Sequence, residues 1–112
     1  MNIAIDEKLP QVTVISPAGR MDAGNAGEFT EAFGAILERK PATLVVNLDE
    51  LEYISSAGLR SVLTLIKAAK ASGTALRFCA MQPMVADVFK VSGFSAMLAI
   101  FDTLEAALAG EG

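Results

Sequence analysis

The 112-residue chain contains no histidine and no tryptophan, and it has only one cysteine. Without histidine it cannot form a Ser-His-Asp triad, a His-based zinc site or a His proton shuttle. The single cysteine, Cys79, has no partner for a disulfide, and its place in an apolar run predicts a buried core thiol. These absences disfavour the common hydrolases, oxidoreductases and metalloenzymes, so we expect a non-enzymatic protein without cofactor or metal.

Clusters of basic residues and long apolar runs are also missing. The nine Lys and Arg are scattered and outnumbered by 13 Asp and Glu, which disfavours nucleic-acid binding. No apolar run approaches the roughly 18 residues that a membrane span needs. The first residues lack the basic start and apolar stretch of a signal peptide. We therefore expect a cytoplasmic protein that neither binds nucleic acid nor inserts into a membrane.

The apolar residues that are present follow an alternation of strands and helices. Their periods predict strands near residues 2–6, 11–16, 43–48, 75–80 and 97–101, and helices within 26–40, 57–72 and 83–91 and after Asp102. Turn and cap residues predict that Pro17 and Gly19 break the second strand, that residues 49–52 form an acidic turn, that Gly73 ends the second helix in the left-handed conformation and that Asp102 caps the last helix. Strands that alternate with helices form a sheet with parallel strands joined by crossovers, whereas the first two strands predict a hairpin. We therefore predict one α/β domain over residues 1–112, with a mixed four- to five-stranded sheet and about four helices mainly on one face.

The junction Tyr53-Ile54-Ser55-Ser56-Ala57-Gly58-Leu59 is the most informative segment. Two adjacent hydroxyls lie where a strand ends and a helix begins. Ser56 is placed to cap the helix by accepting a hydrogen bond from a backbone N–H, and Ser55 can do so one residue earlier. Capping alone explains a serine here, so this interpretation stays open beside a functional one.

The functional interpretation is that a serine at this junction carries a phosphate. The free N–H groups and the dipole at a helix start favour an anion, so the fold would tolerate a phosphoserine there. The phosphate adds about −1.5 to −2 charges at neutral pH. A surface that binds a partner through an uncharged serine would bind very differently once it is phosphorylated.

Four segments resemble anti-sigma factor antagonists, which are single STAS domains. Gly19-Arg20-Met21-Asp22 is similar to the family's Gly-Glu/Arg-Leu-Asp, and residues 44–48 to its central strand. Residues 51–59 resemble its apolar-Asp-Ser-Ser/Thr-Gly-Leu signature, with Ser55 in place of the usual Asp and Ala57 in place of the second hydroxyl residue. Residues 89–94 resemble the late Phe-x-x-Ser-Gly-Leu segment. The resemblance covers nearly the whole chain and implies the STAS fold.

The resemblance implies a regulatory function that residue patterns alone do not supply. In this family the unphosphorylated protein binds an anti-sigma factor that is also a serine kinase, and thereby frees the sigma factor. Phosphorylation ends binding, and a serine phosphatase restores it. Alignment of Gly58 and Leu59 places the phosphorylated serine at Ser56. The implied partner-binding residues are Asp22, Ala23, Gly24, Asn25, Ser55, Ser56, Ala57, Gly58, Leu59 and Arg60.

Two alternative functions remain from the sequence. The chain can be a constitutive STAS subunit that binds a transporter ATPase or another regulator, with the junction serine only capping the helix. It can also be an enzyme or a nucleotide-binding domain. The second alternative is disfavoured, because no Gly-rich phosphate loop and no base–nucleophile set are present.

Overall fold

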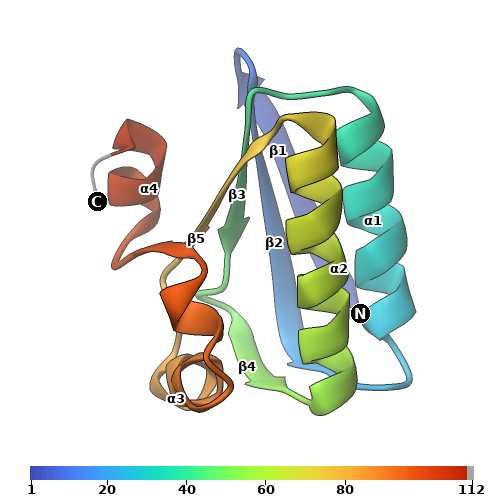
Figure 1. The fold of residues 1–112 in the computed structure, drawn as a ribbon, viewed down its shortest axis with the longest axis vertical. Helices are drawn as coiled ribbons and strands as arrows, with labels where there is room; N and C mark the ends of the chain where they lie inside the picture. The colour runs from blue at the N-terminus through green and yellow to red at the C-terminus, as the bar shows by residue number, and fades with distance from the viewer. Residues whose placement is uncertain (111–112) are drawn as a thin grey trace.

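The chain folds into one mixed sheet with helices layered mainly on one side (Figure 1). The structure is a computed structural model that describes residues 1–110. The sheet has six strands in the order β1-β2-β3-β5-β6, with β4 paired to β2, and only the β1–β2 pair is antiparallel. The elements are β1 (Asn2–Leu9), β2 (Val12–Met21), α1 (Ala26–Glu38), β3 (Thr43–Asn47), β4 (Leu51–Ile54), α2 (Ser56–Ser72), β5 (Ala75–Cys79), α3 (Pro83–Val91), the 3₁₀ helix η1 (Phe94–Ala96), β6 (Ala99–Phe101) and α4 (Leu104–Ala109).

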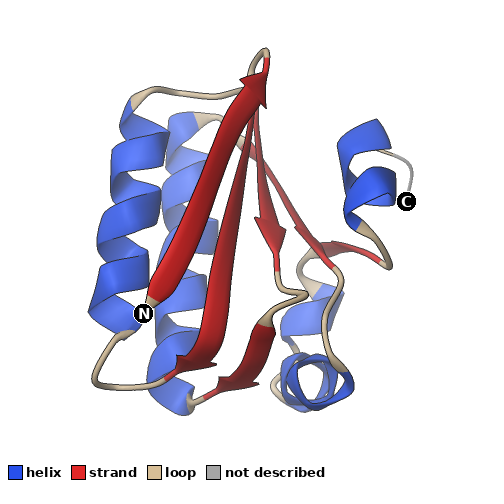
Figure 2. Cartoon of the chain, turned by 180° about the vertical axis from the view of Figure 1, so that it is seen from behind, coloured by secondary structure: helices blue, strands red, loops and turns tan. Residues whose placement is uncertain are grey.

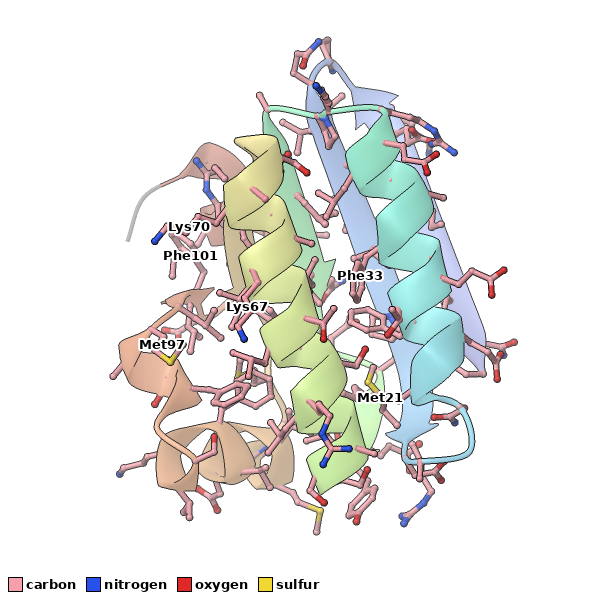
Figure 3. All side chains as sticks on the ribbon, turned by 45° about the vertical axis from the view of Figure 1, so that its right-hand side comes forward. Met21, Phe33, Lys67, Lys70, Met97 and Phe101 are labelled. Atoms are coloured by element: carbon pink, nitrogen blue, oxygen red, sulfur yellow. The ribbon has the colours of Figure 1, made fainter. Side chains whose placement is uncertain are left out.

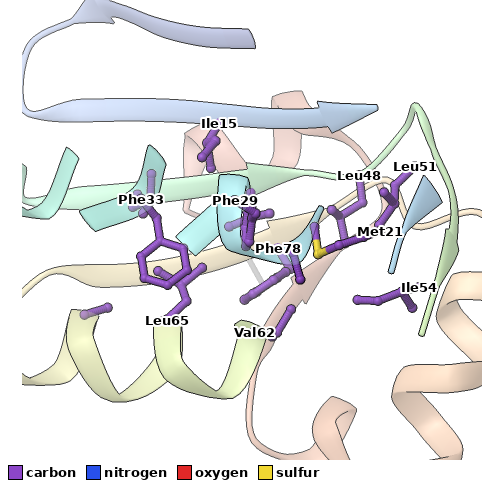
Figure 4. Packing of buried hydrophobic residues seen from close by; sticks show 14 of the residues in the cluster. Ile15, Met21, Phe29, Phe33, Leu48, Leu51, Ile54, Val62, Leu65 and Phe78 are labelled. Carbon is purple, nitrogen blue, oxygen red and sulfur yellow. The ribbon is translucent and has the colours of Figure 1, made fainter. Parts of the chain in front are cut away.

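The main core lies between the sheet and helices α1, α2 and α3 (Figure 4). Successive strand residues point to opposite faces, so Leu44 and Val46 enter this core while Val45 faces the other way. On that opposite face a smaller cluster packs under α4, which lies alone there (Figure 2). The predicted α/β class and the placement of helices mainly on one face are confirmed.

β2 is longer than predicted because it changes partner along its length. We expected Pro17 and Gly19 to end the strand, yet it continues to Met21. Residues 12–15 pair with β3 and residues 19–21 pair with β4, so Pro17, which has no N–H to donate, falls in the gap between the two parallel partners. Gly19, with φ of +85°, allows the bend at this switch.

β4 was not predicted, which makes the expected count of four to five strands wrong. The sequence suggested an acidic turn over residues 49–52, whereas Leu51–Ile54 is a strand. Leu51 is fully buried and Ile54 is 3% exposed, and the segment pairs with the end of β2. A strand of this length is decided by its long-range partner, which local periodicity does not reveal.

The end of α2 agrees with the sequence prediction, whereas the start of α4 does not. Gly73 ends α2 in the left-handed conformation that the sequence predicts. The last helix begins one residue later than expected. Thr103 instead of Asp102 accepts the capping hydrogen bond, from the N–H of Ala106. This register places Ala107 in the cluster under α4, where it is fully buried.

Among residues 1–110, no helix combines the length and apolar character needed to cross a bilayer.

Candidate functional site

The two serines of the strand–helix junction occupy different positions relative to α2. Ser55 is the N-cap of α2: its backbone is extended, and its hydroxyl accepts a hydrogen bond from the N–H of Gly58 at 3.2 Å. Ser55 is half-buried, whereas Ser56, the first helical residue, is exposed. Of the two caps that the sequence left open, the structure selects Ser55. The Ser56 side chain is therefore not needed to cap the helix.

The electrostatic environment at the start of α2 also favours an anion. No acidic residue occupies its first turn, so no carboxylate competes for the positive end of the helix dipole. Arg60 follows Ser56 by four residues and is exposed; residues three and four apart share a helix face. Neither ion pair found within residues 1–110 involves Arg60.

The second predicted segment, residues 22–25, forms a loop fixed by its own hydrogen bonds. The Asp22 carboxylate accepts from the N–H of Gly24 at 2.9 Å, and the Asn25 side-chain oxygen accepts from the N–H of Asp22 at 2.9 Å. The Asn25 amide also donates to the Arg20 carbonyl at 2.7 Å. Asp22 is half-buried, and Ala23 and Gly24 are exposed. The loop therefore presents a defined shape.

The structure brings this loop against the junction. The N–H of Ser55 donates to the carbonyl of Met21 at 2.9 Å, which ties the two segments through their backbones. At Gly58 a Cβ atom would lie 2.6 Å from the Ile54 side chain and 3.1 Å from the Met21 carbonyl oxygen. Only glycine allows α2 to start this close to the end of β2. The end of β2, which leads into residues 22–25, therefore lies against the start of α2, where Gly58 is buried and Ser56 and Arg60 are exposed.

Two contacts beside this surface were missed by sequence reasoning. The Thr30 and Ser61 hydroxyls hydrogen bond at 2.7 Å and join α1 to α2. The Arg20 guanidinium carbon lies 4.1 Å from the centre of the Tyr53 ring, a cation–π geometry between paired residues of β2 and β4. Both contacts depend on pairings distant in sequence, so no local signal was available for them.

Away from the junction, we examined the described residues for metal-ligating groups and for a reactive thiol. Residues 1–110 contain no group of three or more His, Cys, Asp or Glu arranged to hold a metal ion. Cys79 is fully buried, as predicted, and its thiol lies 3.8 Å from the Asn47 side-chain oxygen. Burial, with a smaller contribution from the charge of Asp49, raises the pKa of the Cys79 thiol to about 11. The thiol is therefore neutral at physiological pH and unsuited to nucleophilic chemistry.

Comparison with known proteins agrees with this geometry. The family model described as the STAS domain matches residues 4–107. A relative named as an anti-sigma factor antagonist, BtrV of Bordetella bronchiseptica, is 31% identical over 109 residues, which cover 97% of this chain and 93% of the relative.

Solved structures share the fold at lower sequence identity. An anti-sigma factor antagonist from Mycobacterium paratuberculosis superposes with a TM-score of 0.88 at 22% identity, covering 97% of this chain and 92% of that one. The unphosphorylated form of the anti-sigma factor antagonist SpoIIAA gives 0.80 at 19% identity, covering 96% and 93%. Its phosphorylated form, from Bacillus, gives 0.74 at 18% identity, covering 96% and 97%. The chain belongs to the STAS domain family, as a member of its anti-sigma factor antagonist group.

Proposed function

We propose that this chain binds an anti-sigma factor through the surface formed by residues 22–25 and 55–60, and that phosphorylation of Ser56 ends the binding. The observation that carries this proposal is the division of roles at the junction. Ser55 caps α2, so Ser56 is exposed and free to be modified without loss of the cap. The partner would be both the anti-sigma factor and the serine kinase, and a serine phosphatase would reverse the modification.

The physical basis of the switch is local. A phosphate on Ser56 brings about −1.5 to −2 charges to an exposed position at the start of α2. The free N–H groups at the start of α2 accommodate this charge, so the domain itself stays folded. The partner instead meets a strongly anionic surface where it had bound a neutral hydroxyl. Association therefore weakens although the protein's fold does not change.

The comparisons with known proteins support the same proposal. A relative with 31% identity is named as an anti-sigma factor antagonist, and the fold matches that of a protein solved in both unphosphorylated and phosphorylated forms. Ser55 stands where the family signature usually has Asp. In the structure Ser55 still caps the helix, a role that Asp also fills well. The exchange therefore preserves the cap and removes one negative charge beside Ser56.

The test is a binding titration with the purified anti-sigma factor encoded in the same genome. We expect wild type and Ser56→Ala to bind alike, and Ser56→Asp and the phosphorylated protein to bind at least about tenfold more weakly, a loss of about 1.4 kcal/mol. Thr64→Asp, at an exposed site of α2 outside residues 22–25 and 55–60, serves as the matched control, because it adds the same charge and should bind as the wild type does. Equal affinities for Ser56→Asp and Ser56→Ala would contradict the switch and favour a constitutive STAS subunit.

A further inference from the structure

A pocket of about 380 Å³ lies between α3, η1 and the ends of β5 and β6. Its lining has an apolar part and a polar part, and we call it the β5–β6 pocket; the residues are Met81, Ala86, Ile100, Phe101, Lys90, Ser95 and Asp102. Phe101 lies on the side of α2 that is remote from α1 (Figure 3). None of the lining residues belongs to segments 22–25 or 55–60, so the pocket is separate from the surface proposed to bind the partner.

The pocket forms where two parallel strands end side by side. Cys79 of β5 and Phe101 of β6 are the last paired residues, and the N–H of Ala80 donates to the Phe101 carbonyl at 3.1 Å. Ala80 then leaves the sheet with a φ of +57°, a left-handed conformation that costs energy for a residue with a Cβ atom. This turn places Met81 in the pocket wall. Open α/β sheets hold small ligands outside the carboxyl ends of their strands, and strained residues cluster at such sites.

The size and the apolar part of the pocket suit a small molecule. Pockets that bind small molecules have volumes of roughly 300–1,000 Å³ and are mostly apolar, with a few polar groups that fix the orientation of the ligand. Four of the seven lining residues are apolar here. Ile100 belongs to a strand and is nevertheless 37% exposed, because the pocket leaves its side chain uncovered. A ligand with one apolar group would cover it.

The polar part of the pocket carries one positive and one negative charge that do not pair with each other. Lys90 and Asp102 are exposed, and neither ion pair found within residues 1–110 includes them. A lysine in the last turn of α3 suits the helix dipole, which gives Lys90 a structural role as well. Asp102 has no comparable role, because Thr103 caps α4 in its place. The two charges are therefore both available to a molecule in the pocket.

We infer that the β5–β6 pocket binds a small zwitterion with an apolar side chain, of the chemical class of the neutral α-amino acids. The Lys90 ammonium pairs with the ligand carboxylate, and the Asp102 carboxylate pairs with the ligand ammonium. The apolar side chain packs against Met81, Ile100 and Phe101. A ligand with a single charge would leave one of the two protein charges without a partner. This inference goes beyond the proposed function and does not depend on it.

The experiment titrates the full chain with L-phenylalanine and follows the backbone amides by NMR. A ligand of about 12 non-hydrogen atoms should bind with a Kd of about 1 mM and shift the amides of Ala86, Lys90 and Ser95 saturably. Three probes each lack one feature: glycine has no apolar side chain, hydrocinnamate no ammonium and phenethylamine no carboxylate. Each should bind at least about threefold more weakly than L-phenylalanine. No saturable shift at these amides, or equal binding of glycine, would overturn the inference.

Two variants assign the charges. Lys90→Gln should weaken L-phenylalanine and hydrocinnamate about threefold without weakening phenethylamine, and Asp102→Asn should weaken L-phenylalanine and phenethylamine without weakening hydrocinnamate. Both sites are exposed, so we expect unchanged thermal unfolding. Asp87→Asn is the matched control, because Asp87 is exposed on α3 but does not line the pocket. Wild-type affinity of both variants for all three probes would overturn the inference and leave the proposed switch at Ser56 untouched.

Discussion

The starts of α2 and α4 are capped by the same kind of side-chain hydrogen bond. At α2 the Ser55 hydroxyl accepts the N–H of Gly58 at 3.2 Å, and at α4 the Thr103 hydroxyl accepts the N–H of Ala106 at 3.1 Å. The N-cap backbone is extended in both helices. Both hydroxyls therefore satisfy one free N–H of the first turn, and this similarity alone says nothing about function.

The residues around the two caps are what differ. The first turn of α4 contains Glu105, which already compensates the helix dipole, and its first residue is the apolar Leu104. The first turn of α2 has no acid, its first residue is the exposed Ser56, and Gly58 lets it approach the end of β2. A capping serine is thus an ordinary structural feature. The feature on which the proposed switch rests is a second, exposed hydroxyl at a helix start without a carboxylate.

The largest effect on stability should come from substitution of Gly58, the residue by which the start of α2 differs most from the start of α4. Gly58→Ala places a Cβ within 2.6 Å of Ile54 and 3.1 Å of a backbone oxygen, so we expect a loss of about 2–3 kcal/mol in the free energy of unfolding. Urea denaturation measures it. Gly34→Ala in α1 is the control, because its Cβ meets nothing within 4 Å and the substitution should stabilise the helix by about 0.5–1 kcal/mol. A stable Gly58→Ala variant would show that the close approach is not required.

The next effect concerns the caps themselves. Ser55→Ala and Thr103→Ala should each cost about 1 kcal/mol of unfolding free energy, whereas Ser56→Ala should change it by less than about 0.5 kcal/mol. The measurement is urea denaturation of the three variants under one condition. A larger loss for Ser56→Ala than for Ser55→Ala would reverse the assignment of the cap.

The smallest effect distinguishes the electrostatics of the two first turns. Ser56→Asp adds a carboxylate to α2 and should stabilise the domain by about 0.3–1 kcal/mol at low salt, whereas Glu105→Gln removes one from α4 and should destabilise it by a similar amount. Thermal unfolding at low and high ionic strength measures both. Destabilisation by Ser56→Asp would mean that the start of α2 does not accommodate an anion.

The sequence was sufficient for features set by local chemistry. Periodicity predicted the α/β class and the N-terminal hairpin, and Gly73 marked the end of α2. Cys79 was correctly assigned to the core. These features depend on side-chain period and turn preference, which neighbouring residues carry by themselves.

The features that the sequence did not predict depend on partners far along the chain. β4 exists because Leu51 and Ile54 enter the core beside the end of β2, and the start of α4 is fixed by where Ala107 becomes buried. Similarly, either Ser55 or Ser56 fits a cap by residue type. The choice follows from the strand, which keeps Ile54 in the core and so begins the helix at Ser56.

The most direct test of the account is the position of phosphate in the protein isolated from its native cell. Intact mass would detect the modification, and fragmentation of the peptide that contains both serines would assign it. We predict one phosphate, on Ser56, with Ser55 unmodified because its hydroxyl caps α2. Phosphate on Ser55, or a chain that is never phosphorylated under conditions that change sigma-factor activity, would contradict the account.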